Sequence, residues 1–166
     1  MATETAGQQG LVHLPWDLTE WVDHSALRAW VEEEVGRLNW DNPELVSLLK
    51  AQPVYHPRMM LTLLCYAYLT SVFESEDVLS ACYADPVLHG ICGRLPIPRA
   101  AAIGRFRRDN RGLLRWLLQQ VISRAVQRRF DMAGVAIPAG VKRLIHTNAT
   151  ERLELSRHMD RAAQGA

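Results

Sequence analysis

The sequence lacks the segments that would take it out of the cytoplasm. Its first ten residues are small and polar, without the basic region and apolar stretch of a secretory signal. The most apolar run, residues 59–69, is interrupted by Thr62 and is far shorter than the ~20 residues needed to span a bilayer. We therefore expect a cytoplasmic protein without a membrane partner.

Cysteine is scarce, with only Cys65, Cys82 and Cys92 in the chain. An odd number of cysteines in apolar, helix-like surroundings favours free, buried thiols over a disulfide framework. Cys82, His89 and Cys92 do not follow a zinc-finger spacing, and no fourth ligand is near them in the sequence. We expect no bound metal and no cofactor.

Motifs typical of catalysis are missing as well. The chain has no glycine-rich phosphate loop and no Gly-x-Ser-x-Gly elbow. Glu32, Glu33 and Glu34 fall mostly on the wet side of a helix, so a carboxylate pair for acid–base chemistry is not indicated. His56 lacks a partner nucleophile and is expected at the start of a helix. The sequence predicts a protein that is not an enzyme.

No segment alternates polar and apolar residues with the period of a strand, so the sequence predicts an all-α fold, a compact helical bundle. We expect a disordered tail over residues 1–12 and a single helical domain over 13–166. Helices or helical turns are expected at 16–22, after Asp23, at 44–51, 58–72, 75–84, 87–92 and 99–108, from about 111 through the 120s, at 141–146, and from Asn148 onwards.

Helix ends carry local signals. Asp23 and Ser75 are expected as N-caps, and Pro43 suits a first helical turn. Gly134 to Gly140 is expected to be a loop. Asn148 with Glu151 three residues later predicts a capping box that opens a separate last helix.

Charge is distributed unevenly along the chain. Between Arg94 and Arg129 there are ten arginines and one acid, a local charge of +9, whereas between Asp17 and Glu44 there are eight acids and two arginines, a local charge of −6. This polarity indicates an anionic partner for the basic half.

Four motifs between residues 55 and 110 carry a resemblance to a known family. They are Tyr55-His56-Pro57-Arg58-Met59-Met60, Tyr66-Ala67-Tyr68, Ala81-Cys82, and the segment from Pro98 to Ile103 followed by Arg105-Phe106-Arg107-Arg108. In order and spacing this segment resembles the N-terminal domain of DDE-type insertion-sequence transposases. The resemblance implies a helical, helix-turn-helix-like module that recognises transposon ends.

Two features of the chain depart from that family. The family's polar Asp-His-Ser-Thr is Arg99-Ala100-Ala101-Ala102 here, and a segment that tends to be basic is Phe73-Glu74-Ser75-Glu76-Asp77. The parent enzymes continue into a separate catalytic domain with three acidic metal ligands. Because no strand pattern surrounds the few acids after Asn110, we expect no strand cleavage or transfer by this chain alone.

The arginine-rich segment is the strongest functional signal. Guanidinium groups offer a rigid fork of donors for phosphate, so we expect a duplex DNA-binding face. The residues assigned to it are Arg99, Arg105, Arg107, Arg108, Arg111 and Arg115. The alternative interpretation is a solvated face, or pairing with the acidic helix around Glu32 to Glu34, within one chain or across a homodimer.

Tryptophan is abundant near the N-terminus, at Trp16, Trp21, Trp30 and Trp40. Core packing of a local helical layer explains this abundance. An exposed aromatic patch is the alternative, since tryptophan is enriched at interface cores. The second functional hypothesis is therefore a helical interaction or self-assembly module, in which this acidic, Trp-rich region binds a protein partner.

Overall fold

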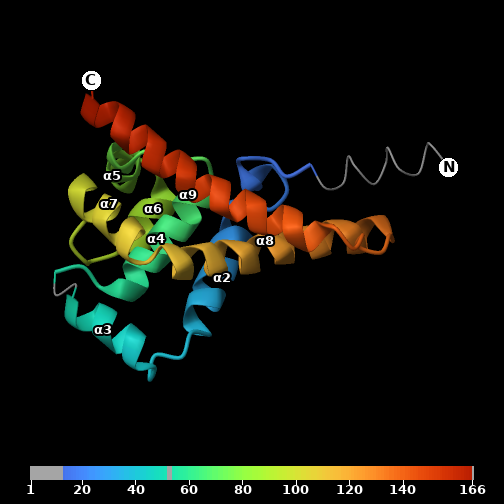
Figure 1. The fold of residues 1–166 in the computed structure, drawn as a ribbon, viewed down its shortest axis with the longest axis horizontal. Helices are drawn as coiled ribbons and strands as arrows, with labels where there is room; N and C mark the ends of the chain where they lie inside the picture. Colours follow the sequence, from blue (N-terminus) through green and yellow to red (C-terminus); the bar gives the residue numbers. More distant parts are fainter. Residues whose placement is uncertain (1–12, 52–53, 166) are drawn as a thin grey trace.

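The computed structural model describes residues 13–51 and 54–165, and within them it contains helices and no strand. The elements in chain order are η1 (Leu18–Glu20, a 3₁₀ turn), α2 (His24–Gly36), α3 (Pro43–Ala51), α4 (Pro57–Leu69), α5 (Ser75–Ala84), α6 (Pro86–Cys92), α7 (Ala100–Asp109), α8 (Arg111–Ala133) and α9 (Val141–Gly165) (Figure 1). The all-α prediction is confirmed. The tail expected at residues 1–12 lies outside the described residues.

Helix α4 is the centre of the molecule. From Met59 to Leu69 every side chain is buried, and α2, α6, α7, α8 and α9 all contact this helix. The His56 side chain starts α4 by accepting a hydrogen bond from Arg58 N at 3.2 Å, and Pro57 occupies the first turn. A helix that is apolar on every side has to be enclosed by others, which explains this central position.

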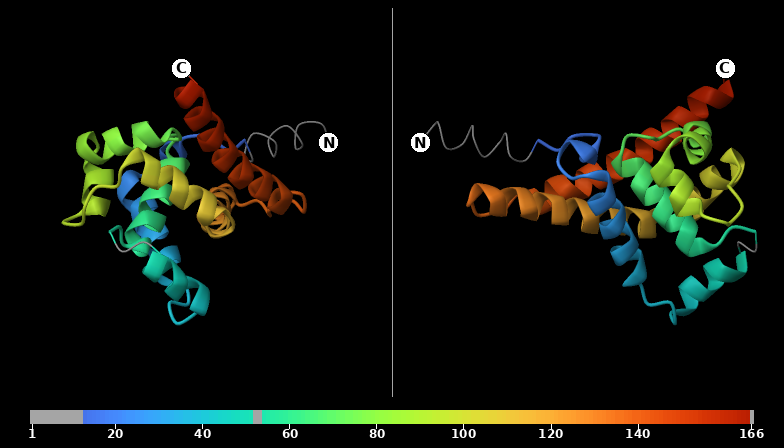
Figure 2. Two further views of the ribbon diagram at one scale, coloured as in Figure 1. Left: turned by 60° about the vertical axis from the view of Figure 1, so that its left-hand side comes forward. Right: turned by 180° about the vertical axis from the view of Figure 1, so that it is seen from behind.

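Helices α8 and α9 form the longest feature of the fold. They contact each other and extend together beyond the other helices, as Figure 1 and the right-hand view of Figure 2 show. Gly134, in the left-handed conformation with φ of 66°, ends α8. Within the described residues, no helix combines the length and apolar character needed to cross a membrane.

Several helix ends lie where the sequence predicts them. Asp23 caps α2 by accepting hydrogen bonds from Ser25 N and Ala26 N. The helix expected at 87–92 begins one residue earlier, at Pro86, and Asp85 caps it in the same way. These signals act over two or three residues, which is why they can be recognised without the tertiary structure.

Two predicted N-caps are wrong, although the helix expected at 75–84 has those bounds. Helix α9 continues unbroken through Asn148, whose side chain is buried and accepts a hydrogen bond from Arg152 Nε at 2.8 Å instead of capping a helix. Ser75 is already helical, and its hydroxyl donates to Asp160 of α9 at 2.6 Å. In both cases the side chain expected to cap a helix binds another side chain: Ser75 binds Asp160 of a distant helix, and Asn148 binds the buried Arg152.

Arg152 is fully buried and joins the two ends of the described chain. Its guanidinium donates to the carbonyl oxygens of Trp16, Tyr68 and Pro15 at 2.7, 2.7 and 2.8 Å. Burial lowers the pKa of Arg152 to about 10. Because every one of these acceptors is a backbone carbonyl, the residue binds the segment before η1 and the end of α4 to α9 irrespective of their side chains.

The tryptophans near the N-terminus are covered by arginines of other elements. The arginine–ring pairs are Arg152 over Trp16 at 5.3 Å, Arg129 over Trp21 at 4.5 Å, Arg124 over Trp30 at 4.9 Å and Arg58 over Trp40 at 4.7 Å. Trp16 is 43% exposed, while the other three are half-buried. These contacts support packing of a local layer as the role of the tryptophans.

Candidate nucleic-acid interface

The arginine-rich segment divides into two groups in the structure. The later group, on α8, faces α2: Arg124 NH1 lies 2.8 Å from Glu33 Oε2 and 3.5 Å from Glu34 Oε1, and Arg128 lies over Trp30. The acidic helix and part of the basic segment therefore neutralise each other within one chain, as the alternative interpretation of the sequence described. Of the remaining arginines, Arg94 and Arg99 precede α7, and the others lie on α7 or at the start of α8.

A groove between α7 and α9 collects the second group. A cavity of about 530 Å³ lies there, and the start of α5 contributes to its lining. It is lined by Glu74, Ser75, Glu76, Ala100, Ala101, Gly104, Arg105, Arg107, Arg108, Arg157, Asp160, Arg161, Ala163 and Gln164. We call this feature the arginine groove.

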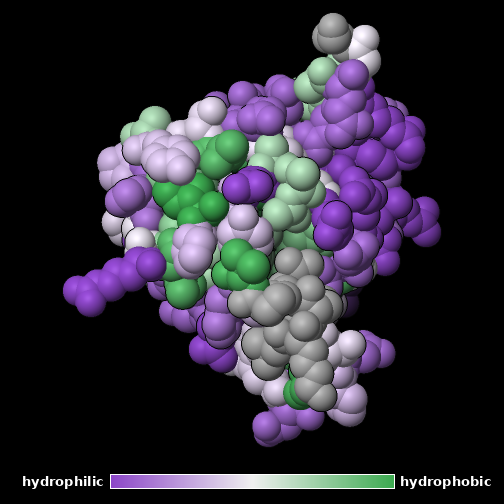
Figure 3. All heavy atoms as spheres, turned by 90° about the vertical axis from the view of Figure 1, so that its left-hand side faces the viewer, coloured by the Kyte–Doolittle hydropathy of each residue, from purple (hydrophilic) through white to green (hydrophobic). Residues whose placement is uncertain are grey.

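The arginine groove continues towards the first turn of α8. A second cavity of about 240 Å³ shares Arg107, Arg108 and Arg157 with the first and adds Arg111 and Glu154. Figure 3 faces the side of the molecule that carries α5 and α7, and hydrophilic side chains gather along one edge of that face towards the end of α9. The groove is thus an elongated basic depression that runs between two helices.

Asp160 and Arg107 form the base of the groove. Arg107 is 4% exposed and binds Asp160, and it also donates to Ser156 Oγ at 2.8 Å. Asp160 Oδ1 accepts from Ser75 N at 2.7 Å. A carboxylate at the start of α5 is favoured by the helix dipole, so one acid connects α5, α7 and α9.

Glu154 is the counter-ion at the α8 end. It accepts from Arg157 NH2 at 2.6 Å and pairs with Arg111. Partial burial alone would raise the pKa of this carboxyl, but the Arg157 hydrogen bonds and the positive charge of Arg111 outweigh burial and lower it. Glu154 therefore orients both arginines and at the same time reduces the positive charge that they present.

The six arginines predicted from the sequence separate into three sets. Arg105 and Arg108 are exposed and line the groove, and Arg111 lies at its α8 end. Arg99 and Arg115 line neither cavity. Arg107 was expected on the binding face but is buried against Asp160, because its position on α7 points towards α9. That expectation is corrected here: Arg107 supports the groove from below.

Sequence reasoning missed the wall that α9 contributes. Arg157 and Arg161, one helical turn apart, line the cavity opposite Arg105 and Arg108. The signal was present in the sequence as two arginines at i and i+4 on the last helix. Only the packing of α7 against α9 shows that they belong with a segment fifty residues earlier.

Small residues shape the α7 side of the groove. Ala100, Ala101 and Gly104 line the cavity where bulkier side chains would fill it. A Cβ added at Gly104 would lie 3.5 Å from Asp160 Oδ2, an ordinary contact. Ala100 and Ala101, which stand where the transposase family has polar residues, therefore leave space beside the arginines.

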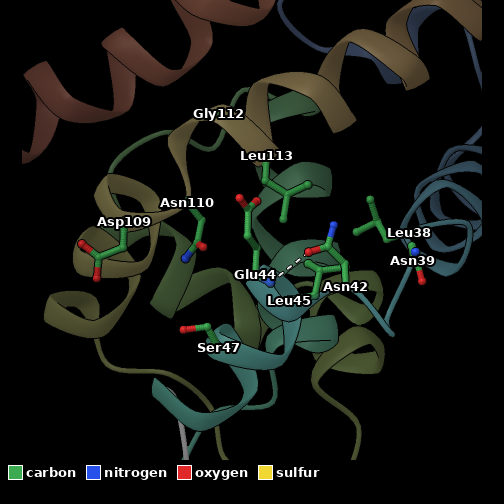
Figure 4. Close-up of a pocket in the computed structure, with 10 residues that line it drawn as sticks. All are labelled: Leu38, Asn39, Asn42, Glu44, Leu45, Ser47, Asp109, Asn110, Gly112 and Leu113. Atoms are coloured by element: carbon green, nitrogen blue, oxygen red, sulfur yellow. Dashed lines mark hydrogen bonds between the residues drawn. The ribbon is translucent and has the colours of Figure 1, made fainter.

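A separate cavity of about 480 Å³ lies between α3 and the corner that joins α7 to α8 (Figure 4). Leu38, Leu45 and Leu113 supply its apolar lining, and Glu44 projects its carboxylate beside Leu113. The lining residues that the structure describes include no arginine or lysine, which distinguishes this cavity from the arginine groove.

The thiols do not assemble a metal site. Cys92 Sγ lies 3.7 Å from Cys82 Sγ, while His89 Nδ1 lies 3.0 Å from the Cys82 carbonyl oxygen. In the described part of the chain, no three or more His, Cys, Asp or Glu side chains are grouped so that they could hold a metal ion.

Comparison with known protein families identifies a domain of transposases in this chain. The model of the transposase domain family DUF772 matches residues 16–109, more than half of the chain, and the chain belongs to this family. The match covers η1 to α7 and stops before α8, so the α9 wall of the groove lies outside it. No curated protein and no solved structure matches the chain.

Proposed function

We propose that this member of the transposase domain family binds duplex DNA through the arginine groove and its α8 end. The observation that carries the proposal is the convergence of Arg105, Arg108, Arg157 and Arg161 from two helices on one cavity. Guanidinium groups bind phosphate oxygens with paired, charge-assisted hydrogen bonds. The buried Arg107–Asp160 pair holds the two helices at a fixed spacing and so preorganises these groups.

The proposal includes the finer relationship, that the chain corresponds to the N-terminal DNA-binding domain of DDE-type transposases. The four motifs between residues 55 and 110 support it. The helix-turn-helix-like segment stays a prediction: α7 and α8 are separated by Asn110 alone, whereas helix-turn-helix units have turns of ~3–4 residues.

We also propose that the chain acts without catalysis of its own. Two carboxylates of the groove, Glu154 and Asp160, are engaged by arginines and act as counter-ions. Incubation of the protein with a duplex and Mg²⁺ or Mn²⁺ tests this point. Nicked, cleaved or joined products that disappear in an Asp160→Asn variant shown by circular dichroism to be folded would contradict it.

A titration of fluorescent duplex DNA at two salt concentrations tests DNA binding. We expect binding that weakens steeply with salt, because each neutralised phosphate releases counter-ions. The triple variant Arg105→Ala, Arg108→Ala and Arg161→Ala should lose most of the affinity and have a shallower salt dependence.

The matched control for this titration is Lys142→Ala with Arg143→Ala. Both residues are exposed at the start of α9, and the nearest groove residue, Leu153, is ten positions further along the helix, about 15 Å away. Loss of affinity in the control equal to that of the triple variant would mean that net charge, and not the groove, carries binding. No binding by the unaltered protein at low salt would overturn the proposal.

A further inference from the structure

One end of the arginine groove is acidic. Glu74 and Glu76, on either side of Ser75 at the start of α5, line the same cavity as Arg105 and Arg161. A nucleic-acid backbone that passed through the whole groove would bring its phosphates beside these carboxylates. Because like charges repel, a strand is favoured beside the arginines of the groove and disfavoured beside Glu74 and Glu76.

The charge of the cavity also distinguishes two kinds of phosphate. Five arginines and three acids line it, an excess of two positive charges (Arg105, Arg107, Arg108, Arg157 and Arg161 against Glu74, Glu76 and Asp160). A phosphodiester inside a strand carries one negative charge, whereas a phosphate on a terminal or side-chain hydroxyl carries about −1.5 to −2 at neutral pH. The excess therefore suits a monoester better than a passing diester.

The size of the cavity agrees with its charge. Its volume of about 530 Å³ falls within the ~300–1,000 Å³ range of pockets for small molecules. A cavity of this size can hold the last nucleotide of a strand. Ala100 and Gly104 leave space for it beside Arg105.

We propose that the arginine groove holds the terminal phosphomonoester of a DNA strand, with the strand leaving towards Arg111. This inference rests on the proposed function, since it names the part of DNA that the groove takes. Arg105 and Arg161, which line only the larger cavity, bind the terminal phosphate, while Arg108, Arg157 and Arg111 follow the backbone away from it. Glu74 and Glu76 stop the strand by repulsion.

Competition between end-modified duplexes tests the inference. One fluorescent duplex is displaced by unlabelled duplexes of the same sequence that carry a 5′-phosphate, a 3′-phosphate or only hydroxyl ends, and by a covalently closed minicircle. We expect one phosphorylated duplex to compete about tenfold better than the hydroxyl form, the gain expected from one or two charge-assisted hydrogen bonds. The minicircle should compete no better than the hydroxyl duplex.

Two variants separate this inference from DNA binding in general. Arg105→Ala with Arg161→Ala should abolish the preference for the phosphorylated end, while Lys142→Ala with Arg143→Ala should retain it. Glu74→Gln with Glu76→Gln should improve competition by the minicircle. Equal competition by all four DNAs would overturn the inference and leave the proposed function intact, whereas no binding to any of them would overturn both.

Discussion

The carboxylate of Asp160 accepts two hydrogen bonds from Ser75, one from the backbone N–H at 2.7 Å and one from the hydroxyl at 2.6 Å. The two residues are separated by 85 positions in the sequence. The residue before Ser75, Glu74, has the N-cap conformation but makes no capping hydrogen bond with its side chain. The start of α5 is therefore capped from α9, and not from its own segment.

Substitution of Asp160 by Ala should destabilise the protein by roughly 3–5 kcal/mol, because Arg107 would remain buried without its counter-ion and α5 would lose its cap. Urea unfolding followed by circular dichroism measures the change. Ser75→Ala provides the comparison, since it removes only the hydroxyl hydrogen bond and should cost about 1 kcal/mol. Equal losses of unfolding free energy in the two variants would show that the Arg107–Asp160 contact does not contribute to stability.

Arg152 is expected to be the most sensitive single position. Replacement by Met keeps most of the volume but leaves the carbonyl oxygens of Pro15, Trp16 and Tyr68 without their donor. We expect a loss of roughly 3–5 kcal/mol in the free energy of unfolding. Arg161→Met, on the exposed side of α9, should stay within about 0.5 kcal/mol of the unaltered protein. A small effect at Arg152 would mean that water replaces the guanidinium.

Glu154→Gln should strengthen DNA binding. The substitution removes the negative charge that Arg111 and Arg157 now share, so both become available to phosphate. We expect the affinity for DNA to rise a few fold at low salt and to depend more steeply on salt, because one or two additional phosphate contacts form. Anisotropy titrations measure it, and weaker binding by the variant would show that Glu154 acts mainly by orienting the arginines.

The same glutamate predicts a pH effect on stability. The Arg157 hydrogen bonds and Arg111 lower the pKa of Glu154 in the folded state, so its contribution is present above the ordinary glutamate pKa of about 4.3 and is lost as the pH falls through the lowered value. Glu154→Gln should therefore have a smaller loss of stability on acidification. Urea midpoints across that pH range test this, and parallel curves for the two proteins would contradict it.

The three thiols should be unreactive in the folded protein. Cys65, Cys82 and Cys92 are at most 1% exposed, and burial raises the pKa of Cys65 well above its usual range. A thiol reagent should therefore modify none of them in native buffer and all three in denaturant. Rapid native labelling of one cysteine would indicate local opening of the helix that carries it.

Local signals in the sequence were sufficient for much of the fold. Asp23, Pro43, Asp85 and Gly134 mark helix ends because their effects depend on neighbours within a few residues. Asn148 misled for the opposite reason. Its spacing to Glu151 fits a capping box, but the buried guanidinium of Arg152 one turn further on binds its side chain, and that depends on tertiary packing.

The sequence predicted the α7 side of the candidate site but not the α9 side. The density of arginine on α7 gave Arg105 and Arg108 directly, since a charged residue on an amphipathic helix tends to be exposed. Arg107 could not be separated from them, because its burial depends on Asp160. Arg157 and Arg161 could not be assigned to the groove from the sequence, because the packing of α7 against α9 is a tertiary contact between segments about fifty residues apart.

The dependence of residues 15 and 16 on Arg152 affects how the protein is made on the ribosome. The carbonyl groups of Pro15 and Trp16 emerge among the first parts of the chain but wait for their donor until α9 has been synthesised. A nascent chain that ends at residue 109, where the family match stops, has neither Arg152 nor Asp160. The contacts that Arg152 and Asp160 make can therefore form only after α9 has left the ribosome.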